Sequence, residues 1–170
     1  MQRVIAYIDG FNLYFGLCSA GLDKYKWLDL SKIVHKLLKP DQELEEIKYF
    51  TSRVNNNPEK QKRQTIYIEA LESTGVKVFY GKYQSIKIEC KRCGNIWNDY
   101  NEKMTDVNIA THMLADANSD KYDMAMLISG DSDLVPSVKL INKEQRNKRV
   151  FIAFPPKDSI PRWLLPQSDI

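Results

Sequence analysis

The amino-acid sequence predicts an α/β protein whose parallel sheet is covered by helices on both faces. Short runs such as residues 3–8 and 123–129 are apolar at almost every position, which is typical of strands buried on both faces. Segments with helical periodicity separate these runs, as in repeated strand–helix units. The chain has 170 residues, of which 43% are hydrophobic, so it is long enough for one domain with a sizeable core.

Each element follows from a local pattern. The expected strands are apolar runs that end at charged or turn residues, and the expected helices have apolar residues three or four positions apart. Ser31 is the expected N-cap of the second helix, Pro58 begins the longest one, and Gly21 and Gly75 each end a helix. In chain order we expect strands at 3–8, 46–54, 76–80, 123–129 and 149–154, and helices at 11–20, 30–38, 58–74, 106–118 and 131–142.

Two segments lack this alternation. The stretch from residue 81 to about 105 is polar, and we expect it to be irregular, with a Cys-x-x-Cys loop at about 86–102. Beyond the last strand, prolines punctuate the chain. We therefore expect one domain over residues 1–155 and a proline-containing C-terminal tail over 156–170.

The charge and cysteine content narrow the class of protein. The chain has 25 Lys and Arg against 22 Asp and Glu, a net charge of +3, which argues against a polybasic binder but not against a nucleic-acid partner. Three cysteines are an odd number, and two of them lie too close together for a disulfide framework, so we expect a reducing, cytoplasmic setting. No signal peptide and no apolar stretch near the ~20 residues of a membrane span is evident.

Acidic residues follow two of the predicted strands. Asp9 ends the first, Asp131 and Asp133 follow the strand at 123–129, and Asp106 begins a helix that can start at the same edge. Ligands of open parallel sheets bind at the carboxyl ends of the strands. Asp is also a good N-cap, so each of these residues has a purely structural interpretation as a helix cap.

A cluster of these carboxylates would repel itself unless cations bridge it. Oxygen ligands without His or Cys favour Mg²⁺ or Mn²⁺, and such an ion suits metal-assisted hydrolysis of a phosphodiester. Asn12, close to Asp9 in the chain, is expected either to hold a water or a phosphate oxygen or to bond its own backbone.

Four strings resemble one known family: YIDGFNLY (7–14), KMTDVNIATHML (103–114), LISGDSDLVPSVKLI (127–141) and KRVFIAF (148–154). Together they are similar to the NYN domain, the LabA-like branch of the PIN-like nuclease superfamily. The resemblance implies a Rossmann-like, three-layer α/β/α fold and a metal-dependent ribonuclease. Acidic residues of the family fall on Asp9, Asp106, Asp131 and Asp133, and its polar residues on Asn12 and Ser129.

This resemblance gives hypothetical roles to the aspartates. Asp9 and Asp131 would be primary metal ligands, while Asp106 and Asp133 would complete the shell, directly or through water, or bind a second ion. The leading interpretation is a cytoplasmic endoribonuclease dependent on Mg²⁺ or Mn²⁺. The alternatives are a non-catalytic or weakly catalytic RNA-binding or regulatory module on the same fold, and a nuclease directed at DNA.

Several cations are candidates for contact with RNA. Arg53 follows a strand, and Lys60, Lys62 and Arg63 lie near the start of the longest helix; a solvated helix face is the alternative. Lys103 and Ser129 are further candidates beside the aspartates. Tyr14 and Phe15 are interpreted either as stacking residues or as core residues.

The pair Cys90 and Cys93, followed by Gly94, is similar to a zinc-knuckle turn. A full zinc site needs four ligands, and the sequence has no second Cys-x-x-Cys. Three interpretations stay open: a reduced turn without metal, a zinc ion shared by two chains in a homodimer, and a redox or residual motif.

Overall fold

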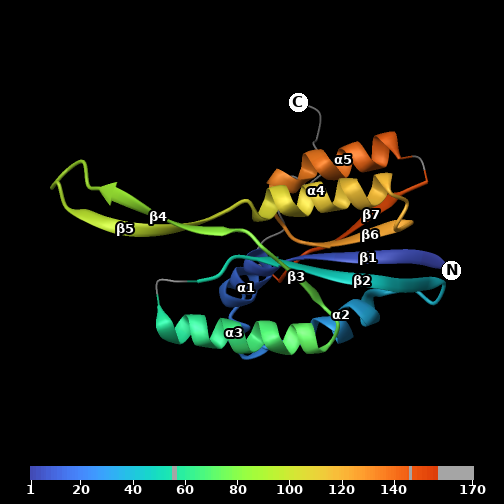
Figure 1. The fold of residues 1–170 in the computed structure, drawn as a ribbon, viewed down its shortest axis with the longest axis horizontal. Helices are drawn as coiled ribbons and strands as arrows, with labels where there is room; N and C mark the ends of the chain where they lie inside the picture. Colours follow the sequence, from blue (N-terminus) through green and yellow to red (C-terminus); the bar gives the residue numbers. More distant parts are fainter. Residues whose placement is uncertain (55–56, 146, 157–170) are drawn as a thin grey trace.

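A five-stranded parallel sheet forms the centre of the molecule, and helices cover both of its faces (Figure 1). The computed structural model describes residues 1–54, 57–145 and 147–156. The strands lie in the order β3-β2-β1-β6-β7, so the expected three-layer α/β fold is confirmed. The elements of this body are β1 (Gln2–Asp9), α1 (Gly10–Ser19), η1 (Asp23–Tyr25), α2 (Leu30–Leu37), β2 (Gln42–Thr51), α3 (Pro58–Ser73), β3 (Lys77–Tyr80), α4 (Thr105–Asn118), β6 (Met124–Ile128), η2 (Ser132–Leu134), α5 (Val135–Glu144) and β7 (Arg149–Ala153).

The central strand β1 explains why the sheet is buried on both faces. Val4, Ala6 and Ile8 contribute to a core shared with α2, while Ile5 and Tyr7 point to the opposite core beneath α4 and α5. This alternation follows from the two-residue period of a strand. A run of apolar residues is therefore needed to fill both cores, and it places the end of β1 in the middle of the sheet.

Local end signals set the helix boundaries, with one exception to the expected pattern. Gly21 and Gly75 have φ angles of +67° and +84°, conformations that glycine adopts without strain. The expected cap at Ser31 is wrong, because the Oδ1 atom of Asp29 accepts the hydrogen bond from the Lys32 amide at 3.1 Å. Asp29 lies one residue before the helix, where a side chain can reach that amide.

The expected irregular segment between β3 and α4 is instead an antiparallel hairpin. Its strands, β4 (Lys82–Glu89) and β5 (Ile96–Lys103), pair with each other and form a separate two-stranded sheet. In Figure 1 the hairpin extends away from the body like an arm. The prediction was wrong because the segment is mostly polar, and its alternation of apolar residues, at Ile86 and Ile88, is too short to mark a strand by itself.

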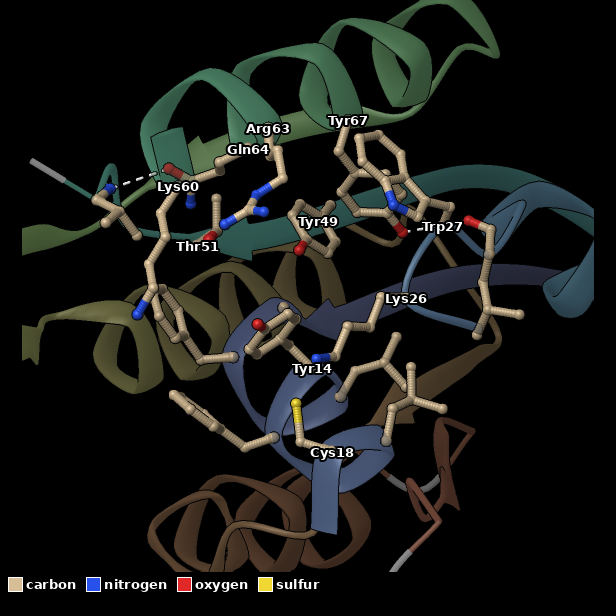
Figure 2. Close-up of a pocket in the computed structure, with 17 residues that line it drawn as sticks. Tyr14, Cys18, Lys26, Trp27, Tyr49, Thr51, Lys60, Arg63, Gln64 and Tyr67 are labelled. Carbon is tan, nitrogen blue, oxygen red and sulfur yellow. Dashed lines mark hydrogen bonds between the residues drawn. The ribbon is translucent and has the colours of Figure 1, made fainter. Parts of the chain in front are cut away.

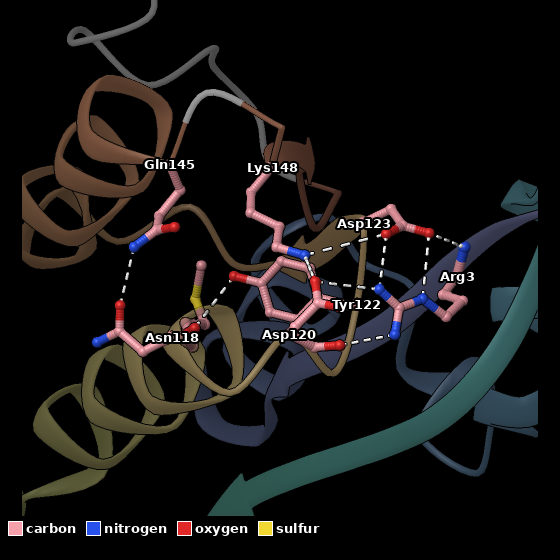
Figure 3. A network of polar contacts seen from close by, with 8 residues as sticks. Arg3, Asn118, Asp120, Tyr122, Asp123, Gln145 and Lys148 are labelled. Carbon is pink, nitrogen blue, oxygen red and sulfur yellow. Dashed lines mark hydrogen bonds and ion pairs between the residues drawn. The ribbon is translucent and has the colours of Figure 1, made fainter.

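Polar contacts join the strands at the amino edge of the sheet, the end away from the strands' carboxyl ends (Figure 3). The guanidinium of Arg3 contacts Asp123 at 2.8 Å and Asp120 at 3.2 Å, and the buried Lys148 amine pairs with Asp120. The Arg3 side chain holds the pKa of Asp123 down at about 2. These contacts connect β1, β6 and β7 at their starts.

Two further expectations are that the chain has no membrane-spanning segment and that it ends in a proline-containing tail. No helix in the described ranges is long and apolar enough to cross a membrane. The expected tail, residues 156–170, lies outside the described residues from position 157 onward, so its separation from the domain stays a prediction.

Candidate active site

The end of β1 and the end of β6 are joined by side-chain hydrogen bonds around Asp9. The Oδ1 atom of Asp9 accepts from the Asn12 amide at 3.0 Å and so caps α1. The Ser129 hydroxyl donates to Asp9 Oδ2 at 2.9 Å and accepts from the Asp131 amide at 3.1 Å. Asp9 and Ser129 are both buried, at 3% and 1% exposure. Ser129 therefore fixes the orientation of Asp9 relative to Asp131.

Asn12 supplies a second connection between these strand ends. Its side-chain oxygen accepts from the Gly130 amide at 2.8 Å. This contact joins Asn12 to the backbone of the neighbouring strand exit and not to its own helix, and its expected role in holding a water or a phosphate oxygen stays a prediction. The turn from Ser129 to Asp131 is thereby held from two sides by residues that follow β1.

The other three aspartates lie close enough to influence one another. Asp131 caps η2, with its Oδ1 atom accepting from the Asp133 amide at 2.9 Å. Burial raises the pKa of the Asp106 carboxyl, and the negative charges of Asp131 and Asp133 raise it further. The start of α4 therefore does bring Asp106 to the edge where β6 ends, as the strand-end argument required.

The donor chemistry of this edge suits a hard divalent cation. Its available ligand atoms are carboxylate and amide oxygens, and burial together with repulsion from Asp131 and Asp133 raises the pKa of Asp106. Within the described residues, no three His, Cys, Asp or Glu side chains gather closely enough to hold one ion together. Mg²⁺ commonly binds one or two carboxylates and keeps several waters. The residues present fit an ion held in that manner.

The expected RNA-contacting cations separate into two groups. Arg53 lies two residues beyond β2, where its guanidinium donates to the Tyr80 hydroxyl at 3.1 Å and stacks 4.6 Å from that ring. Lys103 is exposed at the end of β5, just before α4. Arg53 therefore lies at the carboxyl edge, beside the end of β3. Lys60, Lys62 and Arg63 are exposed in the first turns of α3.

The arm ends in a tight turn that contains the two close cysteines. The Cys90 amide donates to the Asn95 carbonyl and the Gly94 amide to the Cys90 carbonyl, each at 2.8 Å, and Gly94 has a φ of +67°. Hydrogen bonds from the backbone of Arg92 and Cys93, then from the Cys93 thiol, lower the pKa of the Cys90 thiol. Cys18, the third thiol, belongs to α1 in the body of the molecule.

A pocket of about 590 Å³ opens between α1, the segment before α2 and the start of α3 (Figure 2). Its walls include Tyr14, Trp27 and Tyr67, and its cations are Lys26, Lys60 and Arg63. Lys62 is absent from its lining. Phe15 also lines it and is 59% exposed, so the interpretation of Phe15 as a core residue is wrong.

Sequence reasoning did not single out Trp27, Lys26 or Tyr67. They belong to separate segments that only the fold brings together, and Trp27 is 54% exposed, a property that the sequence pattern does not reveal. The one signal available was an excess of aromatic residues around α1 and before α2.

A comparison with protein families settles the relationship that the strings suggested. The family model described as NYN domain matches residues 3–168. The chain belongs to the NYN domain family. NYN domains are part of the PIN-like nuclease superfamily, so the central sheet and its helices form a nuclease-type fold.

Two further proteins are similar to this NYN chain. One is the 6-hydroxy-3-succinoylpyridine 3-monooxygenase of Pseudomonas putida, 26% identical over 189 residues that cover 90% of this chain; the chain spans 59% of that relative's length. The other is a crystal structure of a protein of unknown function from Vibrio parahaemolyticus RIMD 2210633. It matches with a TM-score of 0.57 and 19% identity over 90% of this chain and 81% of its own. At that identity, the likeness supports the fold alone.

Proposed function

We propose that this NYN protein is a ribonuclease that uses Mg²⁺ or Mn²⁺ to hydrolyse internal phosphodiester bonds of RNA. One observation carries the proposal. The ends of β1 and β6 and the start of α4 bring Asp9, Asp106, Asp131 and Asp133 to one edge of the sheet, where burial, and then the charges of Asp131 and Asp133, raise the pKa of Asp106. A protein that only binds a polyanion gains nothing from carboxylates that repel both each other and the ligand.

The proposed primary ligands of the ion are Asp9 and Asp131, while Asp106 and Asp133 complete its shell, directly or through water. A bound Mg²⁺ or Mn²⁺ lowers the pKa of water and offsets negative charge on phosphoryl oxygens. Ser129 and Asn12 act as positioning residues, because they hold Asp9 and the turn before Asp131.

The cations would hold the strand on either side of the cleaved bond. Arg53 and Lys103 are exposed near the carboxyl edge and would contact phosphates there. Lys62, exposed on α3, would add to the positive electrostatic potential that attracts the strand. We further propose a cytoplasmic location, since all three cysteines are free thiols.

The test compares RNA and DNA, single- and double-stranded, in Mn²⁺, Mg²⁺ or EDTA. We expect cleavage of RNA that EDTA abolishes and that the Asp131→Asn variant lowers by roughly a hundredfold or more. The Asp41→Asn variant makes the same chemical change at an exposed position before β2, at the opposite edge, and should cleave as the wild type does.

Three outcomes would change the proposal. Cleavage by Asp131→Asn at the wild-type rate would remove the aspartate mechanism. RNA binding without cleavage in any metal would leave an RNA-binding module. Preference for DNA would keep the chemistry and change the substrate.

For the arm we propose that the thiols of Cys90 and Cys93 form half of a zinc site shared by two chains. Backbone amides lower the pKa of Cys90, which favours the thiolate that zinc binds. The turn offers two thiols, whereas a structural zinc site takes four ligands. An arm that extends from the body can bring its tip to a second copy (Figure 1).

Zinc analysis of protein purified without EDTA tests this homodimer. We expect half a zinc per chain and a dimer by sedimentation, both lost in Cys93→Ser and both kept in Cys18→Ser. A zinc-free wild-type protein, or a monomer with bound zinc, would contradict the shared site.

The Pseudomonas relative supports a second candidate, hydroxylation of a small heteroaromatic acid. Its name describes a monooxygenase of a hydroxylated pyridine. The pocket of this chain has aromatic walls with cations, and its volume lies in the range of small-molecule sites, ~300–1,000 Å³. Oxygen uptake with 6-hydroxy-3-succinoylpyridine and a reduced nicotinamide cofactor would favour this candidate; no uptake would remove it.

A further inference from the structure

The pocket beside α1 has walls suited to a planar ring. Aromatic side chains come from α1, β2, α3 and the segment before α2; they are Phe11, Tyr14, Phe15, Trp27, Tyr49 and Tyr67. Trp27 meets Tyr67 edge to face, with centroids 5.7 Å apart and an angle of 89° between the rings. Such a pair cannot cover the faces of both rings. Trp27 and Tyr14 are 54% and 43% exposed, so part of each side chain is accessible to a ligand.

The charge of the pocket suits an anion. The described residues that line it include Lys26, Lys60 and Arg63 but no carboxylate. Lys26 is paired with Asp23 and lies 4.9 Å from the Tyr14 ring. Lys60 and Arg63 form no ion pair within the described ranges, and they lie in the first two turns of α3, where the helix dipole also favours an anion. Figure 2 shows Arg63 and Tyr14 reaching toward the space from opposite sides.

The position of the pocket connects it to the aspartate edge. Gly10 and Phe11 line the pocket and directly follow Asp9. A side chain at Gly10 would place its Cβ atom 2.5 Å from the Tyr49 hydroxyl, so the Tyr49 ring packs directly on the backbone beside Asp9. The pocket and the proposed cleavage site are therefore separated by the first turn of α1.

We propose that this pocket binds one nucleotide, with its base between Trp27 and Tyr14 and its phosphate at Arg63 and Lys60. The inference rests on the proposed function, because it takes the nucleotide to be part of the RNA substrate. Base stacking on aromatic side chains is tolerant of sequence, whereas contacts to base edges would make the pocket selective. The pocket would thus position the strand and place a neighbouring phosphate at the aspartates.

Calorimetric titration in EDTA measures the binding without cleavage. The probes are uridine and adenosine 5′-monophosphates, with ribose 5-phosphate as the ligand that lacks a base. We expect the nucleotides to bind and ribose 5-phosphate to bind much more weakly. Trp27→Leu and Arg63→Gln should each weaken nucleotide binding, roughly five- to hundredfold for the stacking residue. The matched changes on the arm, Trp97→Leu and Arg92→Gln, should leave it unchanged.

Thermal unfolding of each variant shows whether the fold is kept. Arg63 is exposed, so Arg63→Gln should leave the fold intact and report on binding alone. The proposal that this pocket binds a nucleotide would be overturned if the wild type binds no nucleotide, or if Arg63→Gln and Arg92→Gln bind it equally well. A hexanucleotide that binds at least ten times tighter than the monophosphates, and depends on Trp27, shows that the nucleotide belongs to a strand. Equal affinities identify free nucleotides as the ligand.

The Asp131→Asn variant separates this inference from the proposed function. Asp131 is not part of the pocket lining, so this variant should lose cleavage and keep nucleotide binding. Cleavage that depends on Asp131, without any nucleotide binding, would overturn the pocket alone. Nucleotide binding that depends on Trp27, in a protein that cleaves no RNA, would overturn the proposed function and leave the pocket in place.

Discussion

Helix capping and metal binding are compatible roles for the same aspartate. Asp9 uses Oδ1 to cap α1, and Asp131 uses Oδ1 to cap η2. An ionised carboxylate has about four acceptor sites, so one bond to an amide leaves others for a water or an ion. The capping interpretation from the sequence was therefore right for both residues. The caps also fix the rotamers that a binding site needs.

Ser129 should be more important for activity than its small size suggests. In the Ser129→Ala variant the Asp131 amide and Asp9 Oδ2 each lose a partner in a buried setting, at a cost of about 1–3 kcal/mol in the free energy of unfolding. We expect a lower kcat with little change in KM, because Asp9 loses its orientation. Ser73→Ala, which removes an exposed hydroxyl bonded to its own helix, serves as control. Equal rates for the two variants would contradict the positioning role.

The charge of Asp106 should destabilise the metal-free protein. Its folded-state pKa is raised, so above that pKa the native state carries a charge that burial and two neighbouring carboxylates oppose. Asp106→Asn should therefore be more stable than the wild type in EDTA at pH 7, by about 0.5–2 kcal/mol in the free energy of unfolding, and should unfold at a higher temperature. The gain should vanish below about pH 4, where the unfolded chain is protonated as well.

Added Mg²⁺ gives the matching measurement. Its binding to the native state should raise the unfolding temperature of the wild type and do so less for Asp106→Asn. A wild type that is more stable than this variant in EDTA at pH 7 would contradict the repulsion among the three carboxylates.

The parallel sheet was predictable from sequence, but the arm and the pocket were not. Residues 4–8 had to be apolar throughout to fill two cores, and that requirement is visible in the sequence. Among the described residues, none of the arm belongs to either core, so the pairing of β4 with β5 left only a short apolar pattern, at Ile86 and Ile88. Trp27 and Arg63 line one pocket only after α1, α2 and α3 have packed on the sheet, and no local sequence pattern records that arrangement.

A buried ion pair joins β2 to α4 inside one of the cores. Lys48 and Asp116 are 3% and 2% exposed, and the Tyr7 hydroxyl donates to Asp116 at 2.7 Å. Burial raises the pKa of Asp116, but hydrogen bonds from Lys48, Tyr7 and Lys121 outweigh it, so the pKa is lowered. These contacts hold the helix that carries Asp106.

Removing that carboxylate should strongly destabilise the fold. Asp116→Asn leaves the buried Lys48 amine with Glu46, 3.3 Å away, as its remaining carboxylate among the described residues, and should cost up to about 3–5 kcal/mol in urea unfolding at pH 7. Because the folded-state pKa of Asp116 is lowered, its contribution is present above about pH 4 and is lost as the pH falls through the folded-state pKa. Tyr7→Phe should cost only about 0.5–1.5 kcal/mol. A larger loss in Tyr7→Phe than in Asp116→Asn would contradict this assignment.

At the scale of the whole molecule, the two edges of the sheet have different tasks. The amino edge pairs its charges, as Arg3 does with Asp123 and Lys148 with Asp120. The carboxyl edge instead gathers aspartates whose charges raise the pKa of Asp106. The net charge of +3 averages over both. Under the proposed function, one or two bound divalent ions would offset two to four of the aspartate charges at this edge, which would lower its repulsion of a polyanion.

The arm should be separable from the body. β4 and β5 form their own sheet, and an isolated two-stranded hairpin is at best marginally stable in water. Lys82 and Lys103 are paired across its base, so residues 83–102 can be replaced by an Asn-Gly turn. We expect the shortened chain to unfold within a few degrees of the wild type and to cleave a hexanucleotide at a similar rate, because the aspartates and the pocket belong to the body.

The same deletion should abolish zinc binding and dimer formation, since it removes both thiols of the turn. The full-length Cys90→Ser/Cys93→Ser variant separates the metal from the arm, because it keeps the strands and loses the thiolates. If long RNA binds this variant normally but binds the shortened chain weakly, the arm itself contacts RNA. If the hexanucleotide is no longer cleaved after the deletion, the arm belongs to the active site, and the division of the molecule into a catalytic body and a separate arm is wrong.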